Sequence, residues 1–257
     1  MDRRKKARRN KKGSVALILQ TIISIAYAAM LLHMTILLVR QRDSGWFNTI
    51  AIYFPQLVII ISSMALQFIL RIRHRAHTQD GSLLPVLFTF IALESSMIIP
   101  IYSQVTGQTL LPPNGVIYLS RFAFLSSAIL FTFSAVQFYG TNLSRMTLYL
   151  STAIGASFFV SLALPINNAD PLQIFSSSYD AIFLTMLMLV CIAAGLTYVA
   201  AVVKDRATHS VTRSAAFILL IIGNLISMGT DIITGVTSAV IYVAGIILLS
   251  ISAKNTF

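Results

Sequence analysis

Two ionisable side chains stand inside long apolar stretches of this sequence and are the first candidates for chemistry. Glu94 lies in the stretch 83–102, and Arg121 lies in the stretch 115–138. If both stretches are helices, Glu94 is about 12 Å from the end at Tyr102 and Arg121 is about 9 Å from the end at Gly115. A charge inside a membrane is costly unless it is paired. The sequence therefore predicts an intramembrane polar pair, either as a structural staple between two helices or as part of a ligand site.

Other polar residues fall toward the same predicted outer ends and extend the candidate site. They are Asp180, Asp231, Asn224, Tyr102, Tyr118 and Tyr179. Together they could line an outward-facing vestibule that holds a cationic or polar ligand, or a proton. The tyrosines also fit the ordinary belt of aromatic residues at a membrane interface. Both interpretations stay open at the level of sequence.

Enzymatic and metal-binding signatures are missing from the sequence. It has no H-E-x-x-H, G-x-S-x-G, P-loop or G-x-G-x-x-G motif. His33 has no second His, Cys or carboxylate at ligand spacing in its own stretch, and Cys191 is the single cysteine. We therefore expect no metal, no cofactor and no catalytic residues. An intramembrane lipid-modifying enzyme that uses Glu94 or Asp231 remains the weakest alternative.

The elements that must position these residues are eight apolar stretches separated by short polar breaks. Hydrophobic residues make up 56% of the 257 positions and charged residues only 11%, against about 25% charged in soluble domains. Most stretches match the roughly 20 residues that a helix needs to cross the hydrocarbon layer. The sequence predicts an all-α bundle with eight spans, at Ser14–Val39, Phe47–Leu70, Leu83–Tyr102, Gly115–Phe138, Met146–Leu164, Ala181–Val203, Ser214–Met228 and Ile232–Ser252.

The last two spans form almost one apolar block, residues 214–252. A single helix of this length would be about 58 Å long, nearly twice the hydrocarbon thickness. Gly229, Thr230 and Asp231 supply a flexible residue and a charge near its middle. We expect a tight hairpin there, with seven spans as the alternative.

Basic residues set the predicted orientation. With the N-terminus in the cytoplasm, most of the 19 Lys and Arg residues fall on inner segments, and only Arg40 and Arg42 fall on outer ones. Basic residues accumulate on the cytoplasmic side of membrane proteins. The pattern favours an even number of spans with both termini in the cytoplasm.

The N-terminal segment 1–13 is a dense basic arm. Its basic residues are Arg3, Arg4, Lys5, Lys6, Arg8, Arg9, Lys11 and Lys12. Such a charge run repels itself, so we expect it to be disordered and to rest on anionic lipid headgroups. No aromatic residue interleaves the charges, which argues against nucleic-acid binding. Residues 14–252 then form the transmembrane domain, and residues 253–257 form a short cytoplasmic tail.

Small and hydroxylated residues in the spans are interpreted as packing residues. Ser62–Ser63, Ser95–Ser96 and Ser126–Ser127 lie in successive spans, and Gly223 and Ser227 have small-xxx-small spacing. Such residues let membrane helices approach closely. Pro100, six residues after Glu94, is expected to kink its helix and splay the outer end.

Three function classes remain from the sequence. The first is a non-enzymatic sensor or accessory subunit, which would pass its signal to a membrane-protein partner or to another copy of itself. The second is a transporter of a small solute or ion, although the two halves show no repeat. The third is the lipid-modifying enzyme. Each would sit in a plasma membrane or a bacterial inner membrane.

Overall fold

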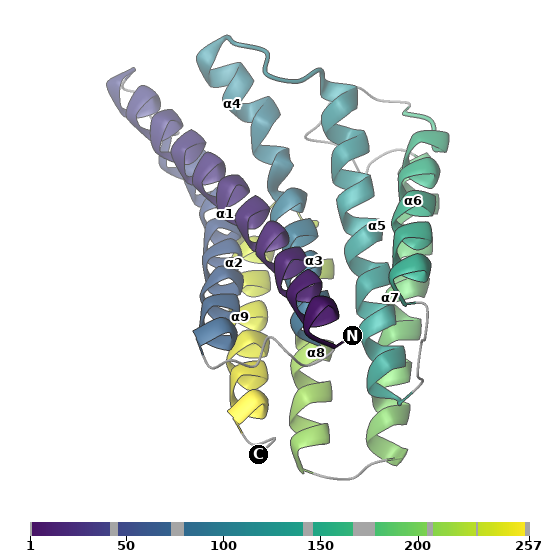
Figure 1. Ribbon diagram of the computed structural model, residues 1–257. Helices are drawn as coiled ribbons and strands as arrows, with labels where there is room; N and C mark the ends of the chain where they lie inside the picture. Colours follow the sequence, from purple (N-terminus) through teal and green to yellow (C-terminus); the bar gives the residue numbers. More distant parts are fainter. Residues whose placement is uncertain are drawn as a thin grey trace.

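The computed structural model describes residues 2–41, 46–72, 80–140, 146–166, 178–204, 208–229 and 231–254. The side chains of residues 2–14, 46, 48–49, 71–72, 80–82, 146–147, 178–180, 208–209 and 253–254 lie outside this description. The described part is all-helical, as predicted (Figure 1). Its elements are α1 (Asp2–Arg40), α2 (Trp46–Ile72), α3 (Asp80–Glu94), the 3₁₀ turn η2 (Ser95–Met97), α4 (Ile98–Thr106), α5 (Pro113–Phe138), α6 (Met146–Ala163), α7 (Ser178–Lys204), α8 (Thr208–Ile226) and α9 (Ile232–Lys254).

Six helical segments are long and apolar enough to cross a membrane. They are Val15–Arg40, Ile50–Leu70, Leu83–Thr106, Pro113–Phe138, Ala181–Lys204 and Ile232–Ser252. Two further apolar helical segments, Leu148–Ala163 in α6 and Ser210–Ile226 in α8, are shorter. Each of the eight predicted stretches thus falls on a helix, with α3, η2 and α4 together making one of them.

The N-terminal basic segment belongs to α1 in the structure. The backbone of residues 2–13 is helical, whereas the sequence analysis expects a disordered arm there. Lys, Arg and Ala are good helix formers, and a helix already nucleated in the apolar part extends at little cost. At the other end of the chain, α9 includes Lys254, and residues 255–257 lie outside the description.

The apolar block 214–252 is divided between two helices, as the sequence predicts. Helix α8 ends at Ile226 and α9 begins at Ile232, so one continuous helix is not what forms. The two helices pack closely, and the Ser238 hydroxyl donates to the Gly223 carbonyl over 2.7 Å. The small side of α8 at Gly223 therefore serves as a contact surface for α9.

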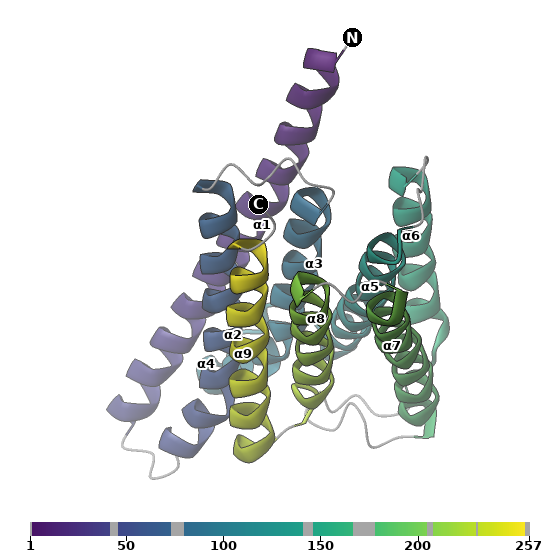
Figure 2. The same cartoon turned by 90° about the horizontal axis from the view of Figure 1, so that it is seen from below.

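Two views of the bundle agree on its layout (Figures 1 and 2). Helices α1, α2, α4 and α9 lie on one side, α5, α6 and α7 lie on the other, and α3 and α8 stand between them. In the segments Leu83–Thr106 and Pro113–Phe138, 61% and 67% of the residues in the most apolar 18-residue window are buried, against 28–33% for the other four long segments. The spans that carry Glu94 and Arg121 are therefore the most buried of the six.

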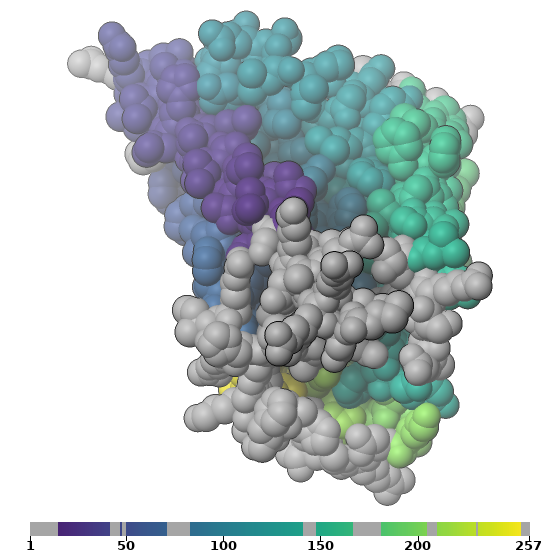
Figure 3. All heavy atoms as spheres, viewed as in Figure 1, coloured from purple at the N-terminus to yellow at the C-terminus, as the bar shows by residue number. Residues whose placement is uncertain are grey.

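Apolar packing divides along the same lines. The larger cluster joins α3, α5, α7, α8 and α9, with Ile59 and Leu66 of α2, around Phe88, Phe131, Phe183 and Phe217, all fully buried. The smaller cluster joins α1, α2 and α4, with Ala92 of α3. Figure 3 shows α1, α4, α5 and α6 side by side across the upper part of one face. Many side chains on the outer surfaces are large and apolar, including Phe159 and Ile233, as lipid contact requires.

We predict that Gly223→Val destabilises the bundle while Gly195→Val does not. A Cβ atom at Gly223 would lie 3.2 Å from both Cβ and the backbone N of Tyr242, whereas nothing lies within 4 Å of one at Gly195. Overpacking of this kind costs about 1–3 kcal/mol. Thermal unfolding of the two purified variants in the same detergent measures the difference. Equal melting temperatures would contradict the close α8–α9 contact.

Candidate functional site

The third span changes its helical hydrogen-bond pattern directly after Glu94. Helix α3 ends at this residue, the 3₁₀ turn η2 follows, and the helix resumes as α4. Pro100 supplies the cause, because it has no N–H to donate to the carbonyl of Ser96 four residues earlier and its ring crowds that carbonyl. The effect of Pro100 is therefore a change of helix type one turn before it, at the residue that carries the charge. Short 3₁₀ stretches within helices often mark functional hinges.

Glu94 lies at the centre of a three-helix hydrogen-bond triangle. The Ser127 hydroxyl of α5 donates to Glu94 Oε1 over 2.6 Å, and the Asn224 amide of α8 donates to the same oxygen over 3.2 Å. Asn224 Nδ2 also lies 3.2 Å from Ser127 Oγ, which closes the triangle. Glu94, Ser127 and Asn224 are 3%, 0% and 5% exposed. We call these three residues the Glu94 cluster.

Three buried hydroxyl groups have no hydrogen-bond partner in the described part of the chain. They belong to Ser96 of η2, Ser126 of α5 and Tyr242 of α9.

Arg121 has other neighbours than Glu94. Its Nη1 donates to the Leu164 carbonyl over 3.1 Å, and its guanidinium carbon lies 5.9 Å from the centre of the Phe183 ring. Arg121 is not among the hydrogen-bond partners found for Glu94. The predicted matched depth rests on helix ends at Tyr102 and Gly115. Counted from the observed ends Thr106 and Pro113, Glu94 lies about 18 Å deep and Arg121 only about 12 Å deep.

The side chain level with Glu94 on α5 is therefore Ser127. It lies about 21 Å from the end at Pro113 at the standard helical rise. Sequence analysis assigns the Ser126–Ser127 pair to packing and so misses this role. Ser127 can be identified as the neighbour of Glu94 by counting residues from the ends of the two helices, once those ends are known.

The residues predicted to line an outer vestibule do not come together in the described part of the chain. Asn224 joins the Glu94 cluster, whereas the Tyr102 hydroxyl lies 2.7 Å from His33 Nδ1 of α1. Asp231 is exposed beside the start of α9. The side chains of Tyr179 and Asp180 lie outside the description, as do those of the basic residues from Arg3 to Lys12.

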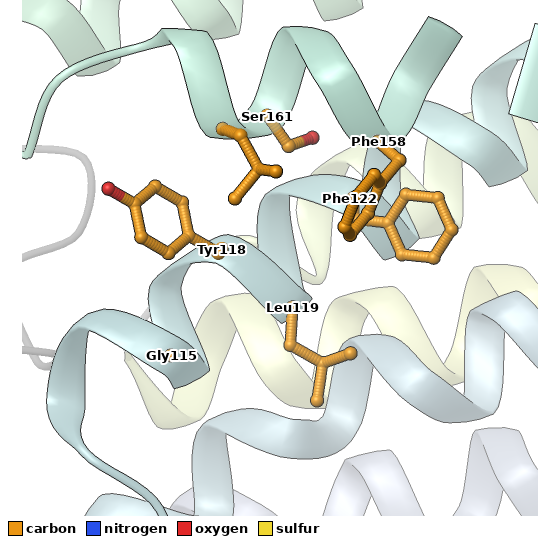
Figure 4. Close-up of a pocket in the computed structure, with 7 residues that line it drawn as sticks. Gly115, Tyr118, Leu119, Phe122, Phe158 and Ser161 are labelled. Carbon is orange, nitrogen blue, oxygen red and sulfur yellow. The ribbon is translucent and has the colours of Figure 1, made fainter. Parts of the chain in front are cut away.

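Tyr118 lines a cleft between α5 and α6 (Figure 4). The cleft has a volume of about 170 Å³, and the rings of Phe122 and Phe158 meet edge to face inside it, with centroids 5.6 Å apart. Its remaining lining is Gly115, Leu119, Ser161 and Leu162. This lining suits hydrocarbon better than a polar ligand.

A second buried polar cluster links α1 to α2, and the sequence analysis missed it. The Gln20 amide donates to Ser63 Oγ over 2.9 Å, and the Gln67 amide donates to Gln20 Oε1. All three side chains are buried. Gln20 and Gln67 carry no charge, so the sequence analysis did not select them as candidates. Two glutamines inside apolar stretches could nevertheless have predicted a hydrogen bond between the two helices. A hydrogen bond between membrane helices contributes about 0.6 kcal/mol on average, so this cluster serves as a cross-link.

Basic and aromatic side chains meet where α5 ends and α8 begins. The Lys204 ammonium donates to the Tyr139 carbonyl over 3.1 Å and lies 4.5 Å from the centre of the Tyr139 ring. The Arg213 guanidinium lies 4.9 Å from the centre of the Phe138 ring. Such contacts hold cations against aromatic faces with about 0.5–2 kcal/mol each. They fix the ends of α5, α7 and α8 relative to one another.

Comparisons with known proteins add no assignment, since no protein family, curated protein or solved structure matches the chain. Across the described residues, no group of three or more His, Cys, Asp or Glu side chains is placed to hold a metal ion. The fold and composition define the class: a helical protein with six membrane-compatible spans, as in multi-pass integral membrane proteins.

We predict that Glu94 and Asn224 are energetically coupled, whereas Glu94 and Arg121 are not. The measurement is a double-mutant cycle with Glu94→Gln and Asn224→Leu, read as unfolding free energy in detergent. The expected coupling is about 0.6–2 kcal/mol, because one buried hydrogen bond is shared. The matched cycle with Glu94→Gln and Arg121→Gln should be additive within about 0.5 kcal/mol. Coupling to Arg121 instead would restore the pair expected from sequence.

Proposed function

We propose that this chain is a non-enzymatic sensor or accessory subunit of a membrane complex, with the Glu94 cluster as the site where its signal begins. The single observation that carries the proposal is a buried carboxyl group beside a 3₁₀ turn in a long span, bonded to side chains of two other helices. A change at Glu94 alters bonds to α5 and α8 at once.

Burial of the cluster favours a conformational role over catalysis. Glu94 is 3% exposed and lies among hydroxyl, amide and apolar groups. A lipid-modifying enzyme would need a second acid or base group convergent with Glu94 and an opening for its substrate. The apolar cleft lined by Tyr118 and Phe158 contains no carboxylate among its lining residues.

The proposed topology has eight spans and both termini in the cytoplasm. The apolar parts of α6 and α8 cover residues 148–163 and 210–226, about 24–26 Å at the helical rise and so a little short of the hydrocarbon thickness of about 30 Å. Small tilts of neighbours or local thinning of the bilayer accommodate such a deficit. Figure 1, with both termini in its lower half, is in keeping with an even number of crossings.

The proposed surroundings follow from charge and size. The basic arm from Arg3 to Lys12 would rest on anionic headgroups at the inner face, at about 1 kcal/mol per basic residue. A membrane-protein partner or a second copy would receive the signal, because the connections between helices are too short to form an output domain. A plasma membrane or bacterial inner membrane suits this arrangement, and nucleic acid has no part in it.

A transporter of a small solute or ion is the second candidate. The observation in its favour is the 3₁₀ turn beside a buried carboxyl group in the third span, since transporter sites lie where membrane helices depart from regular geometry. In this case the Glu94 cluster would exchange bonds during alternating access. The lack of a visible repeat between the two halves of the sequence counts against it.

The sensor or subunit role predicts that the full-length protein copurifies with another membrane protein in a mild detergent. Mass spectrometry of the purified material, with and without cross-linking in the membrane, provides the measurement. Gly223→Val, which loosens α8 and α9, should reduce recovery of the partner, whereas Gly195→Val should not. Recovery of a lone monomer that moves solute across liposomes would instead favour the transporter.

The topology predicts which positions are accessible from outside the cell. In a Cys191→Ser background, a cysteine at Thr256 should react with an impermeant maleimide only after permeabilisation. A cysteine at Gln108, an exposed position between α4 and α5, should react in intact cells. Labelling of the Thr256 position from outside, with the Gln108 position also accessible, would require an odd number of spans.

A further inference from the structure

We propose that the cleft between α5 and α6 binds one acyl chain of a membrane phospholipid. The proposal goes beyond the signalling role, because it assigns a lipid site to a part of the bundle that the Glu94 cluster does not use. It is carried by the lining of the cleft, its size, its direction and its opening toward the outer surface of the bundle.

The lining of the cleft sets the class of ligand. None of its seven lining residues carries a charge. The Ser161 hydroxyl already donates to the Ser157 carbonyl of its own helix over 2.7 Å. Arg121 is absent from the lining, and its guanidinium donates to the Leu164 carbonyl instead. The cleft therefore suits hydrocarbon.

One wall of the cleft is fixed by a row of aromatic rings. The Phe122 ring lies edge to face between Phe90 of α3, at 5.4 Å between centroids, and Phe158 of α6, at 5.6 Å. Such pairs are favourable and restrict ring orientation. A hydrocarbon chain that lies against an ordered wall keeps its dispersion contacts, whereas fluid neighbouring chains keep exchanging theirs. The cleft is thus shaped before a ligand enters, as binding sites usually are.

The size of the cleft selects a thin occupant. Its volume of about 170 Å³ is close to that of an apolar protein cavity of about 150 Å³ that binds benzene. It therefore holds a hydrocarbon segment of about six carbon atoms. A helix of a partner protein, about 10 Å across with its side chains, is too wide to enter.

The direction of the cleft matches that of a lipid chain. Its lining extends from Gly115 to Phe122 on α5 and from Phe158 to Leu162 on α6, about 10 Å and 6 Å at the helical rise. The cleft thus runs along the helices, as acyl chains do in a bilayer. Phe122 lies about 14 Å from the start of α5 at Pro113, within the half of the hydrocarbon layer that one leaflet fills.

The opening and the upper end of the cleft suit a phospholipid. Phe158 and Leu162 are 47% and 44% exposed, so a chain can enter sideways from the surrounding lipid. Tyr118 lies toward the start of α5, and its hydroxyl points away from the rings of Phe122 and Phe158 (Figure 4). Tyrosines at this level contact the polar boundary of the bilayer. The ester end of the lipid would lie beside Tyr118, with its chain continuing toward Phe122.

The test uses a tryptophan in the cleft and a phospholipid with bromine atoms in the upper half of one acyl chain, because bromine quenches tryptophan fluorescence on contact. Trp46 is the single tryptophan, so the full-length protein carries Trp46→Phe and Phe158→Trp. It is reconstituted in phosphatidylcholine vesicles with increasing fractions of brominated phosphatidylcholine. We expect fluorescence to fall in direct proportion to the brominated fraction, because a single chain position is filled by one lipid or the other.

Phe159→Trp in the same background is the matched control. This neighbouring position is 71% exposed and meets several lipid chains, so its fluorescence should fall more steeply at low brominated fractions. A Phe158→Trp curve as steep as this control would assign ordinary surface lipid to the cleft and overturn the proposal. Absence of quenching at Phe158→Trp would overturn it too, by showing the cleft closed or filled by protein. If Phe158→Trp fails to fold, Leu162→Trp is the second reporter in the lining, with the same outcomes.

A variant that fills the cleft tests the site directly. Ser161→Leu, added to the reporter protein, places a larger apolar side chain in the lining and should reduce quenching severalfold. Ser151→Leu is the same change on α6 at an exposed position outside the cleft, and it should leave quenching unchanged. Equal quenching in the two variants would overturn the proposal. The result does not depend on whether the protein copurifies with a partner.

Discussion

The burial of the Glu94 carboxyl group is the constraint on which the rest of the site depends. Glu94 is 3% exposed and lies in one of the two most buried of the six long apolar segments, directly before the 3₁₀ turn η2. A buried carboxyl group needs hydrogen-bond partners. Ser127 and Asn224 supply them by donating to Oε1 of Glu94.

The surrounding bundle keeps these donors in register. Asn224 is fixed by α8, and α8 is held against α9 through the contact of Gly223 with Tyr242 and the hydrogen bond from Ser238. Ser127 is fixed by α5, whose end is tied to α7 through Lys204 and Tyr139. Because interiors of this kind are closely packed and switch between discrete arrangements, a change at one corner of the triangle reaches three helices. This coupling of three helices is the physical argument for the proposed signalling role.

The sequence predicts the helical class and all eight helical stretches, because long apolar runs in lipid have few alternatives to a helix. It also predicts the division of the block 214–252 into two helices, from its length and from Gly229, Thr230 and Asp231 near its middle. The hydrogen-bond partners of Glu94 were harder to predict from the sequence. The depths of Glu94 and Arg121 were counted from Tyr102 and Gly115, whereas the helices end four residues later, at Thr106, and begin two residues earlier, at Pro113. An error of one turn in a helix changes which neighbour a side chain meets, so that Ser127 stands where Arg121 was expected.

The roles of uncharged polar residues inside the spans were also not predicted from the sequence. Gln20, Gln67 and Ser127 each lie inside an apolar stretch, where a hydroxyl or amide is inexpensive enough to need no special explanation in a sequence. In the folded bundle, the glutamines tie α1 to α2, and Ser127 completes the site around Glu94. The two clusters differ in one respect that decides their roles. The glutamine cluster is neutral and serves as a cross-link, whereas the Glu94 cluster contains an ionisable group, so only the second can change its charge and its bonds in response to a ligand.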